Sequence, residues 1–164
     1  MRPTDFETIL KILASHKVDF VMVGGMAAVL QGAPITTFDL DIVHSRADEN
    51  LDRLVAALRD LDAYYREKPD IRIAPDRARL AGPGHHLLLT RAGPLDLLGV
   101  VATGDGYSEL VVHSQTLDLG DGLTTRVLDL KTIIAIKERL DRDTDRAVLP
   151  VLRRTMKEKS GGSL

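Results

Sequence analysis

The 164-residue sequence contains no cysteine and no tryptophan, and aromatic residues make up only 4% of it. Without cysteine the chain has neither a disulfide framework nor a thiolate zinc site, which is compatible with a reducing compartment. A chain of this length is large enough to bury one hydrophobic core without such cross-links. We therefore expect a single globular domain.

Long apolar runs and a strong charge of either sign are also missing. No segment approaches the ~20 consecutive apolar residues of a membrane span, and acidic residues interrupt the N-terminal apolar positions, unlike in a signal peptide. A net charge of −2 gives no general attraction to nucleic acid or anionic lipid, and neither a helix-turn-helix pattern nor a basic stripe indicates a DNA-binding regulator. We expect a cytoplasmic protein with no membrane partner.

Hydrophobic spacing divides the chain into helices and strands. In the first part it predicts a helix over 4–16, strands over 18–23 and 37–44, a short helix over 26–32 and a helix ending near 62. Thr4 and Glu7 have the spacing of a capping box for the first helix. In the second part it predicts short strands within 71–74, 86–90, 95–101, 109–114 and 123–128, and helices over 129–143 and 144–159. This order indicates an α+β protein, an α/β-type mixed sheet flanked by helices, with one domain over 1–158 and a disordered tail over 159–164.

Two aspartates interrupt the second predicted strand. Side chains alternate across a strand, so Asp39 and Asp41 are expected on one face while Phe38 and its apolar neighbours face the core. Two carboxylates this close repel each other, and a divalent cation between them removes that cost. Oxygen ligands without His or Cys favour Mg²⁺ or Mn²⁺ over zinc.

A third aspartate repeats the pattern on a later strand. Asp96 lies between two leucines, and if its strand is a neighbour of the first, three carboxylates converge, enough to hold two metal ions for a phosphoryl displacement. Upstream, Gly24 and Gly25 end one strand and open a helix, where bare backbone can approach a phosphate chain.

This combination resembles the nucleotidyltransferase superfamily of the DNA polymerase β type, in particular the small bacterial AbiEii-like and MNT-like proteins, many of which belong to toxin–antitoxin systems. The matching positions are Gly24, Gly25, Thr37, Asp39, Asp41 and Asp96, and residues 24–43 carry the strongest part of the likeness. AbiEii-like relatives also carry a Lys on a later helix and a basic residue followed by Asp, which Lys137, Arg142 and Asp143 supply here.

The resemblance implies a nucleotidyltransferase that moves a nucleoside monophosphate from an NTP to a hydroxyl or phosphate acceptor. Asp39 and Asp41 would bridge the metal ions and the phosphates, and Asp96 would bind the catalytic metal and help deprotonate the acceptor. Gly24, Gly25, Thr37, Lys137 and Arg142 would contact the nucleotide. The acceptor could be tRNA or other RNA, a protein or a small molecule, and either an antitoxin-like partner or a second copy of the chain could close the cleft.

Two positions depart from the family pattern. Gly25 stands where many relatives have Ser, and Ile35 stands where AbiEii-like relatives often have Arg. Without that Arg the triphosphate would be held more weakly. The alternative function is therefore a catalytically impaired protein of the same fold that binds a nucleotide or a partner without turnover.

Simpler roles remain open for each of these residues. Asp39 and Asp41 fit an edge strand with one hydrated face, and Asp96 fits a solvated position on an antiparallel strand. Lys137, Arg142 and Asp143 fit an ordinary mixed-charge helix surface. His85 and His86 fit an exposed loop pair, while Tyr64 and Tyr65, beside Arg66, fit core and surface packing better than base stacking.

Overall fold

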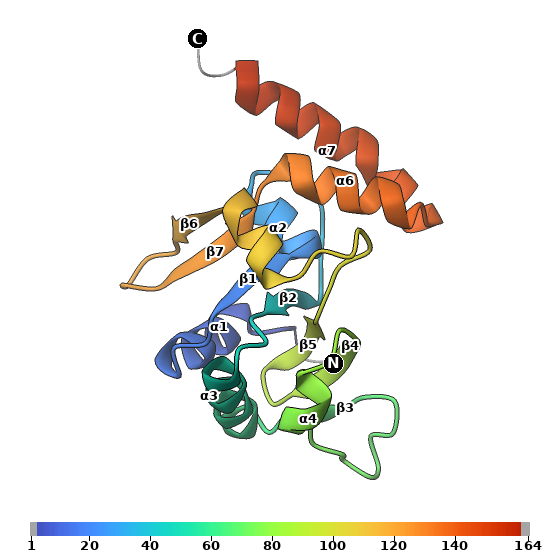
Figure 1. Cartoon of the computed structure of the whole chain (residues 1–164). Helices are drawn as coiled ribbons and strands as arrows, with labels where there is room; N and C mark the ends of the chain where they lie inside the picture. The colour runs from blue at the N-terminus through green and yellow to red at the C-terminus, as the bar shows by residue number, and fades with distance from the viewer. Residues whose placement is uncertain (1–2, 162–164) are drawn as a thin grey trace.

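The computed structural model describes residues 3–161, which form one sheet with helices on both faces (Figure 1). The helices are α1 (Phe6–Ser15), α2 (Gly24–Leu30), α3 (Asp48–Asp60), α4 (Arg77–Leu80), α5 (Tyr107–Leu110), the 3₁₀ turn η1 (Val111–His113), α6 (Leu130–Leu140) and α7 (Asp143–Gly161). The strands are β1 (Phe20–Val23), β2 (Leu40–His44), β3 (Tyr64–Tyr65), β4 (His85–Thr90), β5 (Gly93–Leu98), β6 (Ser114–Asp118) and β7 (Thr124–Leu128). The expected α+β class with a mixed sheet is confirmed.

The order of strands across the sheet is β3-β4-β5-β2-β1-β7-β6. Strand β2 is parallel to β5 and antiparallel to β1, while β1 is parallel to β7. The hairpins β4–β5 and β6–β7 complete the two sides. The two strands that carry the predicted acidic residues are therefore immediate neighbours at the middle of the sheet.

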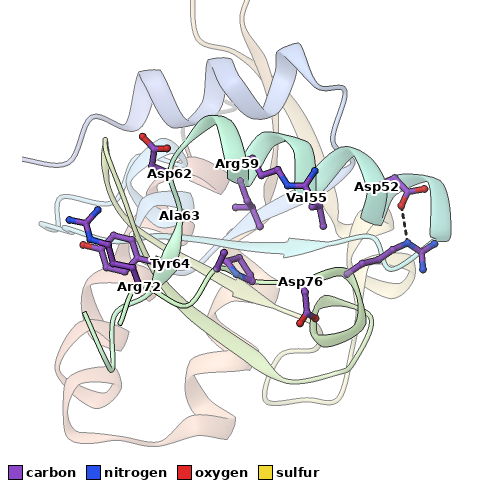
Figure 2. A pocket seen from close by; sticks show the side chains of 12 residues that line it. Asp52, Val55, Arg59, Asp62, Ala63, Tyr64, Arg72 and Asp76 are labelled. Carbon is purple, nitrogen blue, oxygen red and sulfur yellow. Dashed lines mark hydrogen bonds and ion pairs between the residues drawn. The ribbon is translucent and has the colours of Figure 1, made fainter. Parts of the chain in front are cut away.

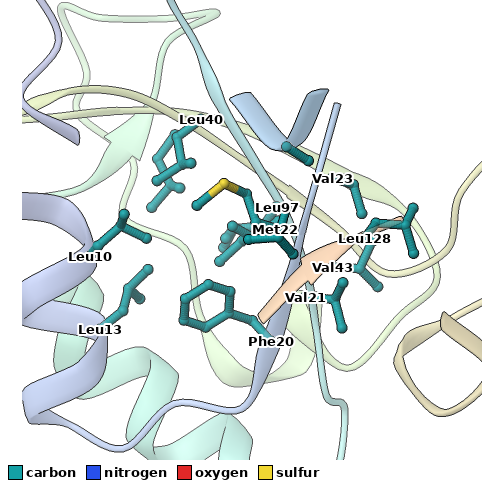
Figure 3. Packing of buried hydrophobic residues seen from close by; sticks show 14 of the residues in the cluster. Leu10, Leu13, Phe20, Val21, Met22, Val23, Leu40, Val43, Leu97 and Leu128 are labelled. Atoms are coloured by element: carbon teal, nitrogen blue, oxygen red, sulfur yellow. The ribbon is translucent and has the colours of Figure 1, made fainter. Parts of the chain in front are cut away.

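Apolar side chains cover both faces of the central strands (Figure 3). Phe20 and Met22 point toward Leu10 and Leu13 of α1, whereas the alternate residues of β1 point to the opposite face with Val43 and Leu128. A strand buried on both faces needs apolar residues at consecutive positions, and all four residues of β1 are buried. This packing fixes the position of the turn that follows β1.

The N-terminal helix is capped differently from the prediction. Asp5, not Thr4, is the N-cap, and its carboxylate accepts a hydrogen bond from the Thr8 amide at 3.0 Å. Glu7 pairs with Lys11 one turn along the helix instead of closing a capping box. The Thr4 hydroxyl instead donates a 2.6 Å hydrogen bond to the Phe38 carbonyl, which ties the chain start to the segment before β2.

Three predicted strands differ in the structure. The second strand starts at Leu40, so residues 37–39 lie outside it, and residues 71–74 belong to the loop between β3 and α4. Residues 109–114 were predicted as a strand, but Glu109 belongs to α5 and η1 follows it, with the Glu109 carboxylate accepting from the Gly106 amide at 3.0 Å. Local capping therefore overrides the β-branched composition there.

The C-terminal helix is longer than expected. Residues 159–161, predicted to belong to a disordered tail, continue α7, and the Lys159 ammonium donates to the Gln31 side chain at 2.9 Å. Residues 162–164 of that predicted tail lie outside the described residues. Across 3–161, no helix combines the length and apolarity that crossing a bilayer requires.

Candidate functional site

Asp41 and Asp96 lie side by side at the centre of the sheet. They are a register pair between the parallel strands β2 and β5, and Asp41 is also opposite Val23, the last residue of β1. Adjacent strands are separated by about 4.8 Å, so the two carboxyl groups are close neighbours. Two of the three predicted acids are thus adjacent in the sheet, and all three border one cavity.

Crowding of these groups changes the acidity of Asp41. Burial and then the negative charge of Asp96 raise the pKa of Asp41 from 3.8 to about 7, with a smaller contribution from Asp39 and an opposing one from Lys137. Near neutral pH a proton therefore compensates part of the repulsion between the two carboxylates. A divalent cation bound to the same oxygens would displace that proton.

Asp39 reaches the site from outside the strand. It precedes β2 and lines the same cavity as Asp41 and Asp96. Phe38, predicted to face the core, is 74% exposed, because the pleated alternation begins only at Leu40. Within residues 3–161 no three His, Cys, Asp or Glu side chains are arranged as a ready metal site. The oxygen donors of Asp41 and Asp96 fit a hard divalent ion, with Asp39 nearby as an additional carboxylate.

Gly24 and Gly25 lie so close to the side chains of Asp41 and Thr37 that neither position has room for a Cβ. Gly24 has a φ of +69°, and a Cβ there would lie 2.2 Å from Asp41 Oδ2. A Cβ at Gly25 would lie 2.8 Å from Thr37 Oγ1. Both positions require glycine, the first for its left-handed backbone and both for space. Gly25 thus makes room for Thr37, and its departure from the Ser of the family pattern has a local steric reason.

These groups border a cavity of about 450 Å³ between the sheet and α6. Lys137 and Arg142 line it together with the three aspartates and both glycines, so cations and anions face the same space. Its remaining lining is largely apolar, with Leu98, Val101, Ile133, Ile136 and Leu140 among the residues. Such a cavity can hold a ligand that has both an anionic part and an apolar part.

Asp145, which the sequence analysis did not single out, positions both cations. Its carboxylate is 1% exposed and accepts from Arg142 Nε at 2.7 Å, from the Arg142 amide at 3.1 Å and from Lys137 Nζ at 3.4 Å. These hydrogen bonds, led by the Arg142 side chain, lower the pKa of Asp145 to about 2. Asp143, the acid the resemblance pointed to, is exposed and pairs with Arg146 instead.

The signal for Asp145 was present in the sequence. Arg142 immediately precedes α7, and Asp145 is the third residue of that helix, the position from which an acidic side chain reaches back to the N-cap amide. In the predicted helix over 144–159 Asp145 is the second residue, so the spacing of this cap is lost.

Arg66 is the second residue that sequence reasoning did not assign to the site. Its guanidinium donates to Asp96 Oδ1 at 2.7 Å and to Oδ2 at 3.5 Å, and also to the Leu88 carbonyl at 3.2 Å. Arg66 directly follows β3, at the edge of the sheet, and reaches across β4. No local sequence pattern predicts this contact, because it depends on the order of the strands in the sheet.

The histidine pair also differs from the prediction. His85 and His86 belong to β4 and not to a loop; His86 is buried and its Nδ1 lies 2.8 Å from the Tyr65 hydroxyl. His85 lines the cavity and hydrogen-bonds to the Val100 carbonyl. Tyr64 and Tyr65 are half-buried in β3. Tyr65 and His86 therefore anchor the short strand from which Arg66 extends.

A second, larger cavity lies away from the acids (Figure 2). It measures about 970 Å³ and lies between α3 and the loop that leads to α4. Its charged lining is balanced, with three arginines and three aspartates, and Arg77 is already paired with Asp52 at 2.8 Å. Neither a glycine turn nor a pair of carboxylates on adjacent strands borders it, so the smaller cavity is the candidate site.

The fold is similar to that of a solved structure. No protein-family model matches the sequence, and no curated protein matches it. A crystal structure from Thermotoga maritima, described as a "putative nucleotidyltransferase", superposes with a TM-score of 0.54 at 17% identity, covering 93% of this chain and 90% of that one. At this identity the likeness establishes the architecture only. The expected resemblance is thus confirmed for the fold: this chain has the architecture of a protein described as a "putative nucleotidyltransferase".

Proposed function

We propose that this protein is a metal-dependent nucleotidyltransferase, which moves a nucleoside monophosphate from an NTP to an acceptor and releases pyrophosphate. The observation that supports the proposal most is the register pair Asp41 and Asp96 beside Gly24, where a side chain would collide with Asp41. An ordinary hydrated strand does not need two neighbouring carboxylates at the bottom of a cavity with two cations.

Each residue has a role that follows from its place. Asp41, Asp96 and Asp39 would hold Mg²⁺ or Mn²⁺, which would stabilise negative charge on the transferred phosphoryl group. Backbone next to Gly24 and Gly25 would approach the phosphates, and the Thr37 hydroxyl lies beside Gly25. Lys137 and Arg142 would neutralise triphosphate charge, with Asp145 holding both on the cavity side. Asp96 would accept the proton of the attacking hydroxyl.

The apolar part of the lining suits a nucleoside. Ile133, Ile136 and Leu140 of α6 are placed to contact a base while the cations bind the triphosphate. None of these three side chains carries a hydrogen-bonding group, so we expect weak discrimination among bases from this wall.

The decisive experiment is label transfer. Purified protein is incubated with Mg²⁺, each α-labelled NTP and separate RNA, protein and small-molecule fractions, in parallel with Asp41→Ala. We expect label in one fraction, lost in the variant. The labelled fraction also identifies the acceptor class and shows whether a cognate antitoxin-like protein is the target. If the wild-type protein shows neither label transfer nor magnesium-dependent NTP binding, the proposal is contradicted.

A second candidate is a binding module that has lost turnover. Its support is Ile35, which is half-buried and packed against the core where relatives often have Arg, together with two rather than three acids in direct contact. Such a module would bind the metal–NTP complex in an Asp41-dependent manner without transferring label to any fraction. The same set of assays therefore separates the two candidates.

A further inference from the structure

Arg66 approaches Asp96 from the side opposite to Asp41. The strand order β3-β4-β5-β2 places Arg66 on one side of β5 and Asp41 on the other, and the second acceptor of Arg66, the Leu88 carbonyl, belongs to β4. The guanidinium therefore occupies oxygen lone pairs of Asp96 away from the glycine turn and the two cavity-lining cations. Because an ionised carboxylate has about four lone-pair sites, these contacts with Arg66 leave Asp96 able to bind a further ligand.

Several contacts anchor Arg66 at the end of the short strand β3. Two residues of β3 pair with β4, the Arg66 amide donates to the Leu87 carbonyl at 3.1 Å, and the preceding Tyr65 is held by buried His86. Asp96 is 14% exposed and the Arg66 side chain 30%, so the ion pair is largely shielded from water. An arginine fork held at both ends fixes the plane of the carboxylate it binds.

From this geometry we propose that Arg66 is a positioning residue that orients Asp96 toward Asp41 for metal binding. The inference rests on the proposed function and adds to it a residue outside the resemblance. A group that orients a metal ligand from behind typically changes metal affinity by about 10- to 100-fold when removed. A cation that merely competes with the metal would have the opposite effect, because its removal leaves more negative charge.

The sign of the change in Mn²⁺ affinity therefore tests the proposal. Mn²⁺ binding is measured by electron paramagnetic resonance for wild type, Arg66→Ala and Arg66→Lys, without any requirement for turnover. We expect Arg66→Ala to bind Mn²⁺ at least ~10-fold more weakly, and Arg66→Lys to be intermediate because it keeps the charge and loses the fork. Added guanidinium should restore Mn²⁺ binding in Arg66→Ala, whereas an equal concentration of ammonium should not.

Controls separate positioning from a loss of fold. Arg77→Ala removes an arginine that pairs with Asp48 and Asp52 at a distance from the site, and it should leave Mn²⁺ affinity unchanged. Circular dichroism checks that each variant is folded, and Arg66→Lys remains informative if Arg66→Ala is not. In steady-state assays of the Arg66 variants, the decrease in kcat should be larger than the change in KM for the NTP.

The possible outcomes separate the role of Arg66 from the proposed function. Equal or tighter Mn²⁺ binding by Arg66→Ala, or a further loss on adding guanidinium, overturns the role of Arg66 and leaves the proposed function standing. Absence of Mn²⁺ and nucleotide binding in the wild-type protein overturns the proposed function and this inference with it.

Discussion

At the scale of single residues, the site is defined by side chains that constrain one another. Gly24 is without a side chain because Asp41 fills that space, and Asp41 holds a proton near neutral pH because burial and then the neighbouring Asp96 raise its pKa to about 7. Exchanging any one of these residues changes the space or the charge of the next. Two substitutions make these dependences measurable.

Asp41→Asn should change how stability depends on pH. The folded protein binds the Asp41 proton more tightly than the unfolded chain, since the pKa is raised from 3.8 to about 7. The stabilisation from Asp41 is complete below about pH 4 and is lost as the pH rises through 7. Without metal, the wild type should lose on the order of 2 kcal/mol relative to Asp41→Asn between pH 5 and 8. Urea unfolding in EDTA at both pH values measures this, and a constant difference would contradict it.

Gly25→Ser should not improve the site, although it matches the family pattern. A Cβ at this position lies 2.8 Å from Thr37 Oγ1 and 3.0 Å from its Cβ, so the segment before β2 must shift. We expect a cost of about 1–2 kcal/mol in the free energy of unfolding and weaker metal binding. Introduced together with Thr37→Ala, the same serine should cost less, because the nearer atom is gone. Equal costs in both backgrounds would rule out this contact as the cause.

At the scale of elements, the connection between α6 and α7 determines where the cavity-lining cations lie. Lys137 comes from α6 and Arg142 from the two-residue connection, and both donate to Asp145 in the first turn of α7. The left-handed Asp141 ends α6 and reverses the chain. The two helices and the cation pair therefore form one unit.

Asp145→Ala should loosen this unit. It leaves Lys137, which is 15% exposed, without its carboxylate, and we expect a loss of about 2 kcal/mol in stability together with weaker NTP binding. Because the pKa of Asp145 is about 2 in the folded protein and 3.8 is its ordinary value, this contribution is present above pH 4 and is lost as the pH falls through 2.

The exposed Asp143 provides the matched control for that variant. It pairs with Arg146 at the surface, and Asp143→Ala should change stability by less than about 0.5 kcal/mol. Chemical denaturation at pH 6 compares the two variants, and similar losses would mean that Asp145 acts only as a surface charge.

The sequence predicted elements where a local pattern and the tertiary environment agree. The first strand, α3 and the pair Asp41 and Asp96 follow from apolar spacing and alternation, which burial in this sheet preserves. Predictions failed where a distant contact or a helix cap determines the local structure. Phe38 faces outward and its carbonyl is bonded to Thr4, and the segment with Glu109 is helical. Arg66 could not be predicted, because its partner is set by the strand order.

At the scale of the whole molecule, a continuous core joins both sides of the sheet. Buried residues run from α1 and α3 through the central strands to α2, α6 and α7, and the site lies at the junction of the sheet with α2 and α6. One core of this kind is expected to unfold cooperatively.

Unfolding should therefore be a single transition with every probe. Tyr64 and Tyr65 lie at one edge of the sheet and Tyr107 in α5, and α5 packs against β1, so near-ultraviolet circular dichroism reports on both regions. The tyrosine signal and the far-ultraviolet signal should have the same midpoint. Leu97→Ala, at a fully buried position of β5, should lower stability by about 2–5 kcal/mol and move both midpoints together. Separate midpoints would indicate two independently unfolding parts.

The hydrogen bond from Thr4 to the Phe38 carbonyl has a practical meaning for anyone who prepares this protein. The main chain of Asp5 is also tied to the hairpin of β4 and β5, through its amide and the Ala92 carbonyl at 2.8 Å. Residues at the beginning of the chain thus brace the stretch that delivers Asp39. A purification tag attached ahead of Thr4 would place additional chain beside these two hydrogen bonds, so assays of this protein are best run on material tagged at the opposite terminus or with the tag removed.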